Sequence, residues 1–133
     1  MKVAVDLSFI RPDHTNGGTE SCIKNLMAGW IQQGVVENFL FFIHDDIYAE
    51  YKRIFPQCQY KVYKCRGNHK MRTTWFQTVL LPAWVKAFNV DVVYYPTYTT
   101  GYYHNISVPV VVNPHDIQFK FYPEYFSELK KIY

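Results

Sequence analysis

A histidine–aspartate pair is the first group of residues in this sequence with the chemistry of a ligand site. His115 and Asp116 directly follow the apolar run Val108–Val112 and the residues Asn113-Pro114. An imidazole at the end of a strand can hydrogen-bond a sugar or phosphate hydroxyl, or it can transfer a proton. Asp116 can orient the ring or cap the next turn. The alternative is a structural pair that binds nothing.

Two adjacent glycines form a second candidate. Gly17 and Gly18 precede a helical pattern, so the backbone can approach a ligand closely, and the free N–H groups of a helix N-terminus favour a phosphate. The pair is neither a GxGxxG fingerprint nor a Walker P-loop, because no Gly-Lys-Ser/Thr follows. The alternative is a flexible turn.

A third group, His44-Asp45-Asp46, offers an imidazole and two carboxylates after an apolar run. We expect Asp45 and Asp46 to point apart and to cap the following helix. No third ligand follows at a supportive spacing, so no metal site is expected. The three cysteines form no CxxC motif, which favours reduced thiols over a metal centre or a disulfide framework.

Aromatic and basic residues gather in two further places. Tyrosines crowd the region around residues 94–103, where they can stack on sugar rings or simply pack a loop: Tyr94, Tyr95, Tyr98, Tyr102 and Tyr103. A basic and aromatic run over residues 61–76 resembles a nucleic-acid or anionic-membrane surface, or else a solvated edge beside a buried helix face: Lys61, Lys64, Arg66, Lys70, Arg72, Trp75 and Phe76.

The elements that must position these residues are strands alternating with helices. Short apolar runs predict strands at Val3–Leu7, Phe39–Ile43, Tyr60–Cys65 (as an edge strand), Val90–Tyr95 and Val108–Val112. Helical periodicity or capping signals predict helices from Thr19 to about Gly34, from Asp45 to about Phe55, over Met71–Phe88 with a break at Pro82, and from Pro123 to Tyr133.

This order predicts an α/β fold with a doubly wound, mainly parallel Rossmann-like sheet and helices on both faces. In such a sheet, ligands bind beyond the carboxyl ends of the strands. The functional search therefore narrows to the residues that follow the strands, at 8–18, 44–46, 96–105 and 113–118.

Charge and hydropathy point to a cytoplasmic protein that does not bind nucleic acid. The net charge of +3 is mild, and no apolar stretch approaches the roughly 20 residues that cross a bilayer. A carboxylate at Asp6 interrupts the segment where a signal peptide would be apolar.

Several segments, in order, resemble glycosyltransferase family 4, the group 1 glycosyltransferases of GT-B architecture. They are Gly17-Gly18-Thr19-Glu20 (the family's GGxE), the segment Arg72–Pro82 with its Arg, Trp, Gln and Leu-Pro, the strand and loop Asp91–Pro96, and the stretches His115–Gln118 and Tyr122–Ser127. The resemblance covers almost the whole chain.

The resemblance implies retaining, metal-independent transfer of a sugar from a nucleotide-sugar donor to a hydroxyl acceptor, with no cofactor. Gly17 and Gly18 would contact the donor diphosphate and His115 the transferring sugar, while Arg72, Trp75, Tyr98 and Asp116 would border the acceptor. The family setting implies a sugar or lipid-linked acceptor, surface polysaccharide or glycoconjugate synthesis, and peripheral contact with the inner face of the membrane.

One departure from the family is large. The family's C-terminal domain binds the nucleotide and carries a basic pair and an E-x7-E-type motif, which this sequence lacks. We therefore expect residues 1–133 to be a single acceptor-side domain, incomplete at its C-terminal end, that is inactive alone and acts with the missing GT-B domain. The alternative is a nonenzymatic Rossmann-like binding module.

Overall fold

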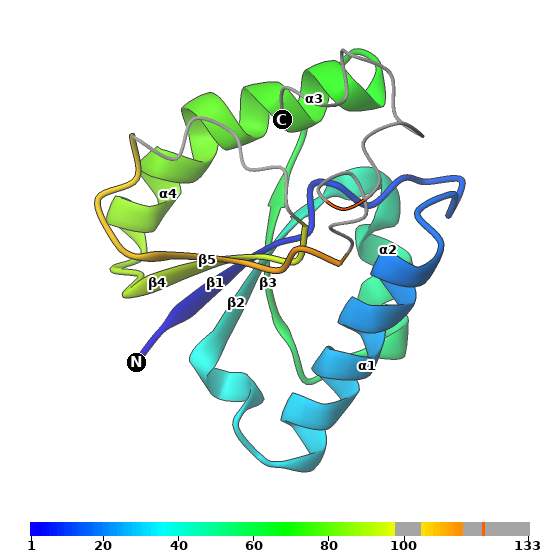
Figure 1. Ribbon diagram of the computed structural model, residues 1–133, viewed down its shortest axis with the longest axis vertical. Coiled ribbons are helices and arrows are strands. Elements are labelled where there is room, and N and C mark those ends of the chain that lie inside the picture. The colour runs from blue at the N-terminus through cyan, green and yellow to red at the C-terminus, as the bar shows by residue number, and fades with distance from the viewer. Residues whose placement is uncertain (98–104, 116–120, 122–133) are drawn as a thin grey trace.

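The computed structural model describes residues 1–97, 105–115 and 121, and these form an α/β fold around an all-parallel sheet (Figure 1). Five strands lie in the order β3-β2-β1-β4-β5. Their bounds are β1 Val3–Asp6, β2 Phe39–His44, β3 Gln59–Tyr63, β4 Val92–Tyr95 and β5 Val110–Val112. The predicted fold class and the predicted edge position of the third strand are both confirmed.

The strand order creates a switch point between β1 and β4. From β1 the chain passes outward through β2 to β3, then returns to place β4 on the other side of β1. β1 pairs with β2 from Val3 opposite Phe39, and with β4 from Val3 opposite Val92. Because consecutive connections leave these neighbouring strands in opposite directions, their carboxyl ends border the crevice where doubly wound sheets bind ligands.

Two helices cover one face of the sheet. α1 (Gly18–Gln32) and α2 (Asp45–Ile54) pack on alternate residues of β1 and β2 in one buried cluster. The apolar stripe of α1 enters this cluster through Ile23 and Met27, and Trp30 stacks on Phe39 with ring centroids 4.0 Å apart. A short 3₁₀ turn, η1 (Val36–Asn38), leads from α1 into β2.

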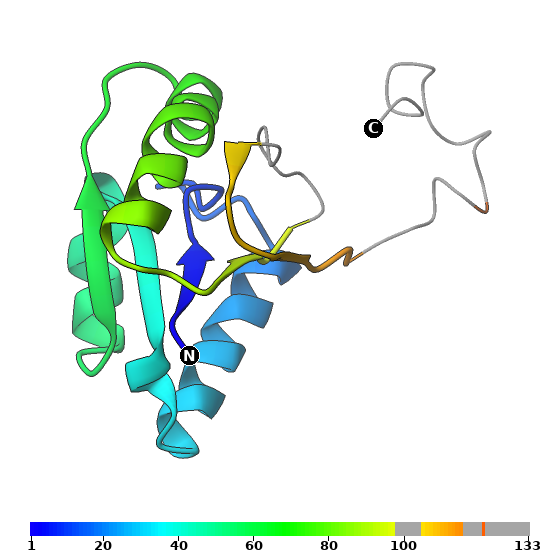
Figure 2. The same ribbon diagram turned by 90° about the vertical axis from the view of Figure 1, so that its left-hand side faces the viewer.

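The opposite face carries the helical segment that follows β3 (Figure 2). It consists of α3 (His69–Trp75), a π-helical stretch η2 (Phe76–Leu80) and α4 (Leu81–Ala87). Pro82 lies in the first turn of α4, where its missing N–H and its ring would disrupt a regular helix. The widened turn immediately before it accommodates this disruption. The predicted break at Pro82 is therefore confirmed.

Two sequence predictions about α2 were wrong. His44, not Asp45 or Asp46, caps the helix, since its Nδ1 accepts a hydrogen bond from the Asp46 backbone N–H at 3.1 Å. The two carboxylates also do not point apart, because Asp45 Oδ1 and Asp46 Oδ2 lie 3.0 and 3.3 Å from the same Nδ1 atom. Both aspartates begin the helix itself, where negative charge favours the helix dipole.

Some predictions lie outside the described residues, namely Tyr98, Asp116 and the helix from Pro123 to Tyr133. Within the described part of the chain, no helix is both long and apolar enough to cross a membrane.

Candidate functional site

A buried polar cluster lies at the carboxyl end of β1. Asp6 and Ser8 are 1% and 2% exposed, in a sheet otherwise packed with apolar side chains. The Ser8 backbone N–H donates to Asp6 Oδ1 at 2.8 Å, and Gln77 Nε2 donates to Asp6 Oδ2 at 2.6 Å. Burial raises the pKa of the Asp6 carboxyl, although the bonds from Ser8 and Gln77 oppose this shift. A carboxyl that resists ionisation therefore lies at the switch point.

Tyr95 adds a hydroxyl at the end of the neighbouring strand β4. The hydroxyl is buried and has no hydrogen-bond partner among the described residues. Burial and, to a smaller extent, the charge of Asp6 raise the pKa of the Tyr95 hydroxyl. The Tyr95 hydroxyl and the Asp6 carboxyl therefore influence each other electrostatically. Buried polar atoms are rarely left unpaired, so this hydroxyl is a notable feature of the carboxyl end of β4.

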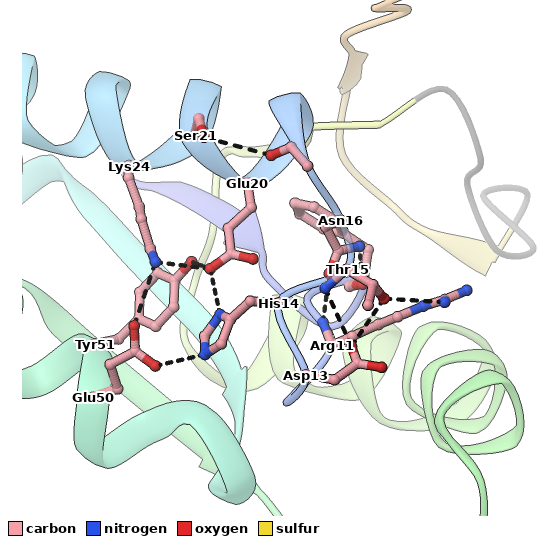
Figure 3. Close-up of polar contacts among 12 residues, drawn as sticks. Arg11, Asp13, His14, Thr15, Asn16, Glu20, Ser21, Lys24, Glu50 and Tyr51 are labelled. Atoms are coloured by element: carbon pink, nitrogen blue, oxygen red, sulfur yellow. Dashed lines mark hydrogen bonds and ion pairs between the residues drawn. The ribbon is translucent and has the colours of Figure 1, made fainter.

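The loop over residues 7–17 leads from this cluster to the N-terminus of α1 (Figure 3). Side chains within the loop hold its shape: Asn16 Oδ1 accepts from the Arg11 backbone N–H at 2.6 Å, and Asn16 Nδ2 donates to the Phe9 carbonyl. On the opposite face, Thr73 Oγ1 of α3 donates to the Ser8 carbonyl at 2.8 Å. The loop is thus an ordered connection that fixes where α1 begins.

The two glycines occupy different backbone conformations. Gly17 has φ 58° and ψ −130°, a region that essentially only glycine adopts, and it precedes α1 without a side-chain cap. Gly18 is the first residue of α1, and a Cβ atom built there would meet nothing within 4 Å. Since a helix leaves its first N–H groups without internal partners, the start of α1 is open toward solvent.

Behind this helix start, His14 joins two helices through carboxylates (Figure 3). Its Nδ1 lies 2.9 Å from Glu20 Oε1 on α1, and its Nε2 lies 3.0 Å from Glu50 Oε2 on α2. Lys24 Nζ pairs with the same two carboxylates at 2.8 and 3.3 Å. Burial alone would raise the pKa of Glu20, but the bonds from Lys24 and His14 outweigh burial and lower it.

Two histidine–carboxylate groups bring ligand-type atoms within 4.8 Å of one another in the described residues: His14 with Glu20 and Glu50, and His44 with Asp45 and Asp46. Both already have internal partners. The Lys24 ammonium bridges the first pair of carboxylates, and the Arg72 guanidinium pairs with Asp46 in the second. The carboxylates of the first group are thus compensated by Lys24, and one of the two carboxylates of the second group by Arg72.

Of the predicted acceptor-side residues, the structure describes Arg72 and Trp75 on α3. Arg72 donates from Nη1 to Asp46 Oδ2, so it is tied to the first turn of α2, and its buried Nε has no partner among the described residues. Trp75 is 41% exposed. The two residues lie three positions apart on the same helix.

His115 lies at the same end of the sheet as the switch point. Its Nε2 donates to the Pro96 carbonyl at 2.6 Å, immediately beyond β4, and its side chain is exposed. Because Nε2 carries the proton in this bond, Nδ1 of the neutral ring is an acceptor. Nearby, Tyr94 and Tyr95 are packed in the fold, and Tyr94 contacts Trp30 edge-on.

Comparison with known proteins identifies no relative: no family model, no curated protein and no solved structure matches this chain. The resemblance to glycosyltransferase family 4 is thus carried by sequence motifs alone.

Sequence reasoning missed the partners of Asp6 and the residues around His14. Gln77 lies 71 positions from Asp6, and nothing in its helical pattern marks it as the donor to that carboxylate. Asp6 itself carried a signal, since a carboxylate that ends a fully apolar strand must find a buried partner. Between His14 and Glu50 the chain forms all of α1 and β2, so no local sequence pattern predicts that these two side chains meet.

Proposed function

We propose that this chain is the acceptor-side domain of a retaining, metal-independent glycosyltransferase that moves a sugar from a nucleotide-sugar donor to a hydroxyl acceptor. The observation that supports this most strongly is the switch point of the sheet beside β1, where the loop over residues 7–17 ends at the uncapped N-terminus of α1. The motif resemblance names the same residues for contact with the donor.

Gly17 and Gly18 would bind the donor diphosphate through backbone N–H groups. The Gly17 backbone turns the chain so that α1 begins facing solvent, and Gly18 presents no side chain there. In sugar transfer, negative charge builds on the departing phosphate, and N–H dipoles fixed in advance stabilise that charge in the transition state.

His115 would contact the transferring sugar. Its Nε2–H bond to the Pro96 carbonyl fixes the ring at the edge of the sheet, and Nδ1 then has the lone pair to accept a hydrogen bond from a sugar hydroxyl. Such a bond orients the sugar while positive charge develops at the anomeric carbon. Asp6 and Gln77 are buried at the carboxyl end of β1 and would act as positioning residues for the loop that follows this strand.

The remaining parts of the reaction follow from the family resemblance. The nucleotide would be held by a separate C-terminal GT-B domain, and the acceptor would be a sugar or a lipid-linked molecule. The setting would be surface polysaccharide or glycoconjugate synthesis at the cytoplasmic face of a membrane, with peripheral contact to its lipids.

The test is a screen of nucleotide sugars for donor hydrolysis and transfer with the complete gene product. We expect at least one donor to be consumed, and we expect His115→Ala to lower turnover at least tenfold with the melting temperature unchanged. Val111→Ala, on the exposed part of β5, is the matched control and should keep full turnover. Full transfer by His115→Ala would remove His115 from the mechanism.

The Gly18→Ala variant distinguishes an effect on ligand binding from an effect on the stability of the fold. Its methyl group meets no protein atom within 4 Å, so a loss of turnover without a loss of stability would indicate a donor phosphate close to the backbone. If no nucleotide sugar is hydrolysed or transferred, the nonenzymatic binding module becomes the better hypothesis.

A further inference from the structure

His14, Glu20, Lys24 and Glu50 form one ion network, the His14 network, and its net charge depends on whether His14 is protonated. Both ring nitrogens of His14 face carboxylate oxygens, at 2.9 Å from Glu20 and 3.0 Å from Glu50. A carboxylate only accepts hydrogen bonds, so both contacts are satisfied only when the ring carries two N–H groups, that is, as imidazolium. Neutral imidazole has one N–H and would direct a lone pair at the other carboxylate.

The groups around His14 make the protonated form the balanced one. From α1 come Glu20 and Lys24, and from α2 come Glu50 and Tyr51, whose hydroxyl donates to Glu20 Oε1 at 3.4 Å. Two carboxylates and one ammonium leave one negative charge, which the imidazolium neutralises. From its own loop, Arg11 and Asp13 both bond to Thr15 and do not contact the ring.

We propose that His14 is a pH-operated latch that holds the β1–α1 loop against α1 and α2 while it is protonated. The latch does not depend on the proposed transferase function. The base of the loop is bonded to β2 through Leu7 and to the helical segment after β3 through His69, Thr73 and Gln77, and its end is bonded to the first turn of α1 through Gly17. The contact to α2 is made by His14 through Glu50. Losing the proton therefore releases the part of the loop around His14 from α2, while the bonds at Leu7, Ser8 and Gly17 hold both ends of the loop.

The direction of the switch follows from the pKa. The hydrogen bond that His14 donates to Glu20, together with the charges of Glu20 and Glu50, raises the pKa of His14 above its ordinary value. The latch is therefore fully closed below about pH 6.5 and opens as the pH rises through the raised value. The residue also has φ 54°, an uncommon backbone conformation that the two carboxylate contacts help to hold.

Titration of the histidine side chains by NMR, on the complete chain, tests the proposal. We expect His14 to titrate above pH 6.5 with both nitrogens protonated at the low-pH end. Hydrogen exchange at residues 11–17, corrected for the intrinsic pH dependence of exchange, should show protection that falls at least tenfold across the same titration. Glu50→Gln should lower the His14 pKa, whereas Glu37→Gln, at an exposed acid in η1, should leave it unchanged.

His14→Gln should remove the pH dependence of loop protection, because an amide does not titrate in this range. Two results would overturn the latch. One is a His14 that titrates at or below pH 6.5, and the other is loop protection that follows the wild-type pH profile in His14→Gln. If His14→Gln does not fold, the Glu50→Gln titration and the wild-type exchange profile decide alone.

Discussion

At the scale of single residues, backbone geometry separates two adjacent glycines that look alike in the sequence. Gly17 needs a conformation that side chains resist, and Gly18 has ordinary helical geometry in open space. Only at the first position does the backbone conformation itself favour glycine, while at the second a side chain would meet no protein atom.

The first prediction compares Gly17→Ala with Gly18→Ala. Gly17→Ala should lower the free energy of unfolding by about 1–3 kcal/mol, because alanine is strained at φ 58°, ψ −130°. Gly18→Ala should leave it unchanged or raise it by up to about 1 kcal/mol, since alanine restricts the unfolded chain and favours helix. Urea denaturation of both variants measures the difference, and equal losses would contradict it.

The second prediction concerns the buried carboxyl of Asp6. Burial raises its pKa, so between about pH 4, where it titrates in the unfolded chain, and the raised value the folded state binds the extra proton. The free energy of unfolding therefore falls as the pH rises through this window, because an ionised carboxylate becomes trapped in the interior.

Asp6→Asn isolates this effect. Its Oδ1 still accepts from the Ser8 N–H, and the Gln77 amide can turn to present its oxygen to the new amide group. Urea denaturation from pH 4 to pH 8 should show wild type losing stability relative to Asp6→Asn as the pH rises. A difference in stability that is constant across this range would show that Asp6 does not titrate as described.

At the scale of elements, the divided helix after β3 is held to the sheet by aromatic packing. Phe76, in the π-helical stretch, is fully buried and stacks on Tyr63 with centroids 4.1 Å apart, and it meets Trp84 and Phe42 edge-on. The widened turn thus orients Phe76 toward the sheet, and Pro82 lies in the first turn of the next helix. The same stretch delivers Gln77 to Asp6.

The third prediction tests this attachment. Phe76→Ala should lower the free energy of unfolding by about 3–5 kcal/mol, since it removes a buried ring and leaves a cavity between helix and sheet. Val79→Ala, three positions later in the same stretch, is the control, because Val79 is 55% exposed and its truncation should cost less than about 0.5 kcal/mol. Similar losses in the two variants would contradict this account of the packing.

At the scale of the whole molecule, the basic run over residues 61–76 does not form one free cationic surface. Lys61 lies over the Phe88 ring at 4.5 Å, Arg72 pairs with Asp46, and Phe76 is buried. The exposed cations left in this run are Lys64, Arg66 and Lys70. A net charge of +3 adds little long-range attraction for a polyanion.

The fourth prediction is that the chain does not bind duplex DNA at about 150 mM salt, where screening acts over about 8 Å. Fluorescence anisotropy with a labelled duplex measures this. Binding that weakens steeply with added salt, and that is lost in a Lys64→Ala, Arg66→Ala variant, would instead support a nucleic-acid interface.

The sequence by itself determined the kinds of elements and their approximate bounds. An apolar run such as Phe39–Ile43 predicts a buried strand because a strand covered on both faces needs consecutive apolar residues, and these can be recognised in the run itself. The break at Pro82 was predictable for the same reason, since the missing N–H is a property of that residue.

Tertiary structure alone decided which side chains meet. The strand order places β4 beside β1, brings Gln77 to Asp6, and sets His14 between Glu20 and Glu50. The His44 cap was missed because a histidine after a strand has no special spacing until its ring turns back on the helix start. These pairings join residues that are far apart in the chain or need one particular rotamer, and local patterns contain neither kind of information.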